Sequence, residues 1–138
     1  MICKVGSIFH NENIVFKNDN SYDINSKYHP CLIISEDEEN FYYLTLTSQI
    51  PYRSLADKYY KLKRNNDNNL KKESYVNLRY IYKKPICWIE EVGFVNEDIL
   101  KDLFTYLDMV QEKYKDKDYE LIKDKISAVN SVKGKEIK

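Results

Sequence analysis

The sequence predicts an α+β protein in which a small antiparallel β-barrel is followed by C-terminal helices. Roughly the first ninety residues contain short apolar and aromatic runs separated by polar turns, most clearly in HPCLIISEDEENFYYLTLTS at 29–48. From Asn96 onward, apolar residues recur at helical spacing instead. On size, the 138 residues are expected to form one domain (1–138), with a barrel core at 1–90, a basic loop at 53–72 and a helical part at 96–130.

Charge and hydropathy narrow the classes of function. Lys+Arg and Asp+Glu are equal at 22 each, so the net charge is zero and any site for a polyanion must be local. The sequence has neither an apolar run near the roughly 20 residues of a membrane span nor the apolar region of a signal peptide. These features predict a soluble, cytoplasmic protein with no membrane partner.

The cysteines and glycines indicate no metal or nucleotide site. Cys3, Cys31 and Cys87 are widely spaced in apolar contexts, which favours reduced thiols in the core over a disulfide framework or a zinc site. The glycines form no phosphate-binding loop, which argues against a kinase or nucleotidase.

The 29–48 stretch reads as a β-hairpin. Residues 30–34 (PCLII) are an apolar strand, 36–40 an acidic turn, and 41–46 (FYYLTL) an aromatic and β-branched strand. The two open ends of a hairpin lie side by side. We therefore expect Lys27 and His29 to approach Thr47 and Ser48, so that a cation, an imidazole and two hydroxyls converge at one rim.

The N-terminal segment predicts a first strand over Met1–Phe9 that bends at Gly6, as strands of a small barrel do. From His10 to Ser26 the composition is polar apart from Ile14–Phe16, which indicates a long loop with a short arm in it. His10 matches no motif and is a weak candidate for a second proton donor.

The stretch 53–72 is locally basic. It has seven cations against Asp57 and Asp67, a local net charge of +5, with Tyr52, Tyr59 and Tyr60 interleaved. The cations are Arg53, Lys58, Lys61, Lys63, Arg64, Lys71 and Lys72. Cations that follow phosphates and rings that stack on bases are typical of a groove for single-stranded nucleic acid. The alternative is a solvated, partly disordered loop, on the expectation that the NNDNN run at 65–69 cannot pack.

The remaining elements are a strand region and two helices. Residues 73–82 alternate as a strand does, and a short strand is expected at Ile86–Ile89 beyond Pro85, which ends the first strand or marks an edge. Asn96 is a good N-cap for a helix that reaches Tyr114. The charged run at 112–125 is expected to be a solvated face, a weaker helix is expected around 121–129, and 131–138 should fray.

Four segments carry a family resemblance. The opening MICKVGSIF, the HP that begins HPCLII, the TLTSQ that ends its partner strand, and LKKESYVNLRYI resemble the MazF/PemK family of toxin endoribonucleases, in the same order and at compatible spacings. The TLTS ending and the long C-terminal helix are also similar to the RNA-antagonised toxins of type III toxin-antitoxin systems (ToxN, AbiQ, CptN and TenpN). The resemblance covers roughly the first ninety residues, and each motif is short.

This resemblance implies an SH3-like antiparallel barrel with C-terminal and peripheral helices, and RNA cleavage that needs no metal or other cofactor. The RNA 2′-hydroxyl would attack the adjacent phosphate and leave a 2′,3′-cyclic phosphate, which requires proton transfer and donors to the phosphate oxygens. His29 stands where the family has arginine, and an imidazole can exchange a proton near neutrality. The expected catalytic residues are Lys27, His29, Thr47 and Ser48. The expected RNA-binding residues are Tyr52, Arg53, Lys58, Tyr59, Lys61, Lys63, Arg64 and Arg79.

The partners expected from the resemblance are an RNA substrate and an antitoxin. The basic stretch, the TLTS ending and the long helix favour an RNA antitoxin (type III), while a small protein antitoxin (type II) is the alternative. A homo-oligomer and a toxin–RNA assembly both stay open. A different class of function also remains, a non-catalytic barrel that binds RNA or peptide through the same rim.

Overall fold

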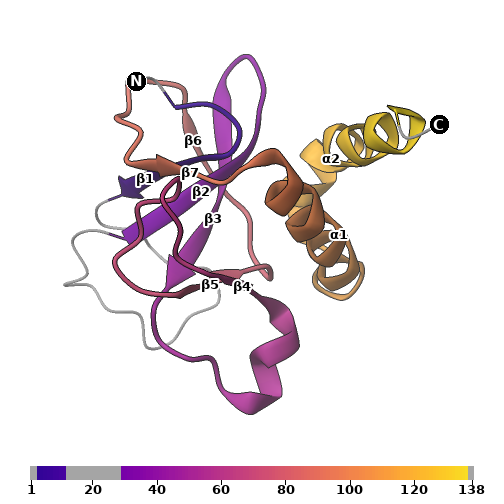
Figure 1. The fold of residues 1–138 in the computed structure, drawn as a ribbon. Helices are drawn as coiled ribbons and strands as arrows, with labels where there is room; N and C mark the ends of the chain where they lie inside the picture. The colour runs from indigo at the N-terminus through magenta and orange to yellow at the C-terminus, as the bar shows by residue number, and fades with distance from the viewer. Residues whose placement is uncertain (1–2, 12–28, 137–138) are drawn as a thin grey trace.

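The computed structural model describes residues 3–11 and 29–136, with side chains to residue 127. Within these ranges an antiparallel sheet of seven strands curls into a half-barrel, and the helices lie together beside it (Figure 1). The predicted α+β class, with a curled sheet and C-terminal helices, is confirmed. In chain order the elements are β1 (Ser7–Asn11), β2 (His29–Glu36), β3 (Asn40–Thr47), the 3₁₀ helix η1 (Arg53–Lys58), β4 (Tyr59–Leu62), β5 (Ser74–Asn77), β6 (Tyr82–Pro85), β7 (Gly93–Phe94), α1 (Glu97–Tyr114) and α2 (Lys117–Glu136).

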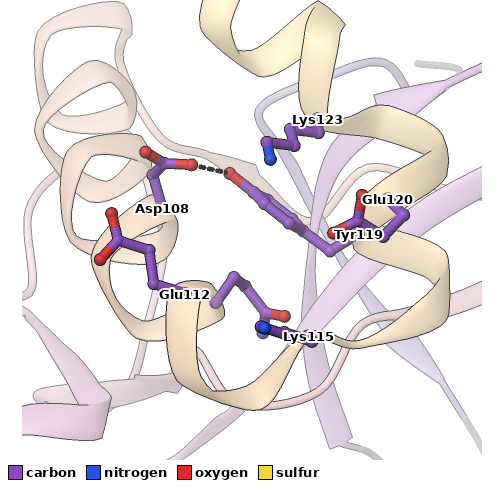
Figure 2. A pocket seen from close by; sticks show the side chains of 7 residues that line it. Asp108, Glu112, Lys115, Tyr119, Glu120 and Lys123 are labelled. Carbon is purple, nitrogen blue, oxygen red and sulfur yellow. Dashed lines mark hydrogen bonds between the residues drawn. The ribbon is translucent and has the colours of Figure 1, made fainter.

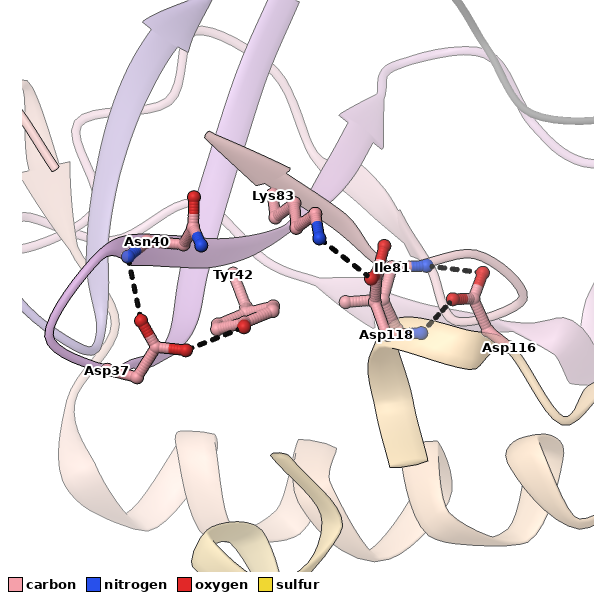
Figure 3. A network of polar contacts seen from close by, with 7 residues as sticks. All are labelled: Asp37, Asn40, Tyr42, Ile81, Lys83, Asp116 and Asp118. Carbon is pink, nitrogen blue, oxygen red and sulfur yellow. Dashed lines mark hydrogen bonds and ion pairs between the residues drawn. The ribbon is translucent and has the colours of Figure 1, made fainter. Parts of the chain in front are cut away.

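The β2–β3 hairpin is at the centre of the sheet, as the sequence predicts. Leu32 pairs with Leu44, and the next pair towards the open end is Cys31 with Thr45. The acidic turn is closed by Asp37, whose carboxylate accepts hydrogen bonds from the backbone N–H of Asn40 at 2.8 Å and the Tyr42 hydroxyl at 2.7 Å (Figure 3). The turn is therefore held by side-chain acceptors of the kind that Asp supplies.

The first strand begins later than the sequence predicts. β1 starts at Ser7 and pairs with β2 and β7, whereas residues before it form a turn in which Gly6 has φ +95°. Gly6 donates to the Ile33 carbonyl and accepts from the Val95 N–H, both at 2.8 Å. The bend at Gly6 is confirmed, although it lies just before the strand and not within it. Glycine suits this position because a positive φ is strained for other residues. The predicted loop at 10–26 overlaps β1 at His10 and Asn11, and its remainder, including Ile14–Phe16, lies outside the described residues.

The stretch 53–72 is not an unpacked loop. Its first half forms η1 and β4, and β4 pairs along its length with β5, whereas residues 63–72 form a loop without helix or strand. The expectation that 65–69 cannot pack is wrong, because Asn68 is buried and its side-chain amide replaces missing backbone partners. Its Oδ1 accepts from the N–H groups of Asn65 and Leu70, and its Nδ2 donates to the Lys63 carbonyl. Gly93 lies directly against this turn, since a Cβ on it would be 2.2 Å from the Asn68 carbonyl oxygen.

The predicted strand at 73–82 is two strands. β5 ends at Asn77 and β6 begins at Tyr82, and both pair with β3. Pro85 ends β6, and the expected strand at Ile86–Ile89 does not form, because the residues facing β3 are already Tyr82–Pro85. As a result Cys87 is exposed, contrary to its expected place in the core, whereas Cys3 and Cys31 are buried as predicted.

The helices follow the sequence at α1 and exceed it at α2. The Asn96 side chain caps α1 by accepting from the Ile99 N–H, and Lys115 ends this helix in the left-handed conformation. α2 extends to Glu136, through the segment expected to fray. It packs through Tyr119, Ile122 and Ile126, while Leu121 is exposed, and the charged residues between are mostly solvated, as predicted.

Two apolar clusters lie on opposite faces of the sheet. The larger joins strand residues such as Leu32, Leu44 and Val76 to Phe104 and Ile122 of the helices. The smaller contains no residue of α1 or α2 and is made of Cys3, Phe9, Cys31, Ile33, Phe41, Tyr43 and Tyr82. Side chains alternate between faces along a strand, so each strand presents every second residue to the helix-free face.

Candidate functional site

At the open end of the hairpin, His29 and Thr47 occupy the ends of the two strands, since β2 begins at His29 and β3 ends at Thr47. Continuing the register from the Cys31–Thr45 pair by two residues sets His29 level with Thr47, on the same face as Cys31. Directly opposed residues of an antiparallel pair have Cβ atoms about 5 Å apart. On its other side His29 pairs with Asn11 of β1.

The other predicted catalytic residues differ in their placement. The Thr47 hydroxyl accepts a hydrogen bond of 3.1 Å from the Gln49 N–H, so this oxygen also closes the strand end. Ser48 follows the strand and is exposed. Lys27 lies outside the described residues, and His10 is exposed on β1.

Strands β5 and β4 extend the helix-free face. Tyr60, Leu62 and Val76 pack towards the helices, so the residues between them on these two strands face the other way. Tyr75 pairs with Thr47 on one side and with Lys61 on the other. Neighbouring strands are about 4.8 Å apart. The face therefore carries an imidazole, a hydroxyl, a phenol and an ammonium in one row across four strands, His29, Thr47, Tyr75 and Lys61.

Arg79 is held rigidly beside this row. Its Nη2 donates to the Tyr59 hydroxyl at 2.8 Å, and its Nε donates to the Asn77 side-chain oxygen at 3.2 Å. Its guanidinium carbon lies 5.3 Å from the ring centres of both Tyr59 and Tyr80, within the range of cation–π attraction. A guanidinium fixed in this way is preorganised to bind an anion.

The corner between α1 and α2 supports the loop that carries Arg79. Gln111 is buried, and its Nε2 donates to the carbonyls of Leu78 and Arg79 at 2.8 and 2.9 Å. Its Oε1 accepts from the Asp116 N–H at 2.9 Å. Asp116 in turn accepts from the Ile81 N–H at 3.1 Å (Figure 3). The loop 78–81 is thus bound to the helices at three backbone groups.

The remaining predicted RNA-binding residues are only partly gathered here. Tyr52 and Arg53 are exposed at the start of η1, and Lys58 pairs with Asp57 at 3.0 Å. Arg64 donates to the Leu70 carbonyl, and the exposed Lys63 is in the segment that follows β4. Lys61 forms an ion pair with Glu73, with 3.5 Å between Nζ and Oε1.

Burial further disfavours the charged forms of two titratable side chains on this face, Cys31 and Tyr43. Desolvation raises the pKa of the Cys31 thiol, which donates a weak hydrogen bond to the His29 carbonyl at 3.6 Å. Desolvation also raises the pKa of Tyr43, whose hydroxyl accepts from the Asn11 amide at 3.0 Å. Neither the Cys31 thiol nor the Tyr43 phenol is therefore suited to proton transfer near neutrality.

Sequence reasoning did not select Tyr75, Asn77 and Gln111. The alternation of SYVN indicates a strand, so Tyr75 and Asn77 could have been placed on the same face as Tyr59. No local pattern identifies Gln111, since its role depends on contact with a loop 32 residues earlier in the chain.

A hollow lies between α1 and α2. It has a volume of about 190 Å³ and is lined by Asp108, Gln111, Glu112, Lys115, Tyr119, Glu120 and Lys123 (Figure 2). The Tyr119 hydroxyl donates to Asp108 at 2.8 Å, and both this bond and burial raise the pKa of Tyr119. The bond joins the two helices and accounts for the tyrosine at this position.

No family model matches the sequence, and neither does any curated protein. In the described ranges, no three His, Cys, Asp or Glu side chains are grouped as metal ligands would be. Neither helix has the length and apolar character required to cross a membrane, as far as the described residues extend.

Proposed function

We propose that this protein is an endoribonuclease toxin of a toxin-antitoxin system, with a SH3-like barrel and its RNA site on the helix-free face. The observation that carries the proposal is that His29 begins β2 and Thr47 ends β3, at the same open end of the hairpin, with the guanidinium of Arg79 fixed on the neighbouring β4–β5 pair. The family resemblance in the first ninety residues supports the same reading.

The proposed chemistry is transesterification without a metal ion. The RNA 2′-oxygen attacks the neighbouring phosphorus, its proton is removed, and the 5′-oxygen leaves as a proton is delivered to it. His29 transfers protons, Thr47 and Ser48 hydrogen-bond the scissile phosphate, and Lys27 and Arg79 stabilise its developing charge. Tyr59 of β4 and Tyr75 of β5, on the helix-free face, provide rings on which unpaired bases stack.

RNA cleavage by the purified protein tests this proposal. Cleavage should persist in EDTA and leave 2′,3′-cyclic phosphate ends. The single variants His29→Ala and Thr47→Ala should each lose about 10²-fold or more in rate. Ser127→Ala, at an exposed position on α2, is a control that should cleave as the wild type does. Full activity in the His29→Ala, Thr47→Ala double variant would rule out this site.

We further propose that the antitoxin is RNA. The local charge of +5 over 53–72 suits a polyanion held along β4 and its flanking segments, whereas a small protein antitoxin is the type II alternative. Toxin expressed with its neighbouring locus should then carry RNA that nuclease or high salt removes, with release of activity. A small protein copurifying without nucleic acid would favour the type II alternative.

A non-catalytic RNA-binding barrel is the second candidate. The acceptance of the Gln49 N–H by the Thr47 hydroxyl favours it, because that oxygen already has a structural role. The two candidates differ in living cells. A toxin arrests growth when it is expressed without its antitoxin, and the His29→Ala variant relieves the arrest, whereas a binding module gives no arrest in either form.

A further inference from the structure

The loop 78–81 joins β5 to β6 and is held from two sides. From the sheet side, the Leu78 N–H bonds to the Lys58 carbonyl and the Arg79 N–H to the Asn77 side-chain oxygen, which leaves the carbonyls of Leu78 and Arg79 to be bound from the helices. The carbonyls of Leu78 and Arg79 and the N–H of Ile81 are bound by Gln111 and Asp116 from the helical corner. The edge-to-face contact of Tyr80 with Tyr114 of α1 joins the same two parts.

We propose that Gln111 is a positioning residue for Arg79, and that the helical corner sets this guanidinium for a backbone phosphate of single-stranded RNA. The phosphate as ligand rests on the proposed function, whereas the positioning stands on the hydrogen bonds alone. Losing Gln111 would leave two backbone carbonyls without their donor, and the loop must then move to find water.

The orientation of Arg79 follows from this support. A guanidinium has five N–H donors, and Arg79 uses one on Asn77 and one on Tyr59, so three remain for a ligand. Both partners, Asn77 and Tyr59, belong to the paired strands β4 and β5. The Arg79 side chain can therefore bond to both only while its own backbone keeps its position relative to these strands. If the backbone moved, the guanidinium would lose its fixed orientation, and a mobile cation binds phosphate less specifically.

The test compares two ways of weakening α1. Gln111→Met keeps the side-chain length but removes the three hydrogen bonds that the Gln111 side chain makes with Leu78, Arg79 and Asp116. Asn96→Ala removes the cap at the opposite end of α1, which is a structural loss of similar size that does not touch the loop. Asp116→Asn is a second variant that weakens the hold on Ile81 and is used should Gln111→Met fail to fold.

The first readout is hydrogen exchange at the Arg79 Nε–H, observed by NMR and assigned by its loss in Arg79→Lys. Exchange should be about tenfold faster in Gln111→Met and in Asp116→Asn, and unchanged in Asn96→Ala. Unchanged exchange in the corner variants would overturn the inference, whatever the protein binds.

The second readout is affinity for a 2′-O-methyl oligouridine, which cannot be cleaved by attack of the 2′-oxygen. Gln111→Met should weaken binding about tenfold and reduce the salt dependence by about one counterion, and Asn96→Ala should do neither. In an Arg79→Lys background, Gln111→Met should cost nothing more. If exchange responds as expected but the wild type does not bind the oligonucleotide, the positioning holds and the proposed function fails. Equal, additive losses from Gln111→Met and Asn96→Ala would show a merely structural role and overturn the inference.

Discussion

Replacing Asn68 by alanine should destabilise the fold far more than its place in an asparagine-rich stretch suggests. Its side chain makes three hydrogen bonds, accepting from Asn65 and Leu70 and donating to the Lys63 carbonyl, and the residue is only 1% exposed. A net contribution of about 1 kcal/mol for each bond gives a loss of about 3 kcal/mol in the free energy of unfolding. Urea denaturation followed by circular dichroism measures this loss.

Two further variants sharpen the measurement. Asn68→Asp keeps the acceptor but turns an oxygen towards the Lys63 carbonyl, so it should also destabilise the protein. Asn66→Ala changes an exposed neighbour in the same turn and should alter the free energy of unfolding by less than about 0.5 kcal/mol. A loss below about 1 kcal/mol in Asn68→Ala, or losses equal at the two positions, would refute the argument that this side chain organises the turn.

Three other expectations follow from the described contacts. Lys63→Gln should reduce the salt dependence of RNA binding by about one counterion, and Lys61→Gln by less because Lys61 is shared with Glu73, as binding titrations at several salt concentrations would show. Hydrogen bonds from the Tyr42 hydroxyl and two backbone N–H groups lower the pKa of Asp37. The ionised carboxylate therefore stabilises the fold above about pH 4, and this contribution is lost as the pH falls through the lowered pKa. The Tyr42→Phe variant should lose less stability than the wild type between pH 6 and pH 3, as measured by urea titrations. Gly93→Ala should cost roughly 1–3 kcal/mol in urea denaturation, because the added Cβ would meet a backbone oxygen at 2.2 Å, and wild-type stability would contradict that contact.

The parts that sequence reasoning predicts well are those specified locally. The hairpin follows from two strand-length runs around an acidic turn, and its pairing extends to Cys31 and Thr45 near the open end. α1 follows from the Asn96 cap and the recurrence of apolar residues at helical spacing. In each case the signal lies within one element, so no knowledge of its neighbours is needed.

The parts that sequence reasoning misses depend on distant contacts. The polar run at 65–69 resembles a solvated loop in sequence. The burial of Asn68 depends on Gly93, a residue distant in sequence that lies against it. Tyr119 is surrounded by charged residues, and its burial results from the contact of α2 with α1. Cys87 has apolar neighbours in sequence but follows the last paired residue of β6 and is exposed.

The support of Arg79 by the helical corner has a consequence for biosynthesis. Gln111 and Asp116 are made after every strand of the sheet, and the ribosome releases them last among the residues that shape the candidate site. A nascent chain that has completed its sheet therefore still lacks the bonds that fix the 78–81 loop. The order of translation therefore delays the fixing of this loop until α1 and the start of α2 have been made.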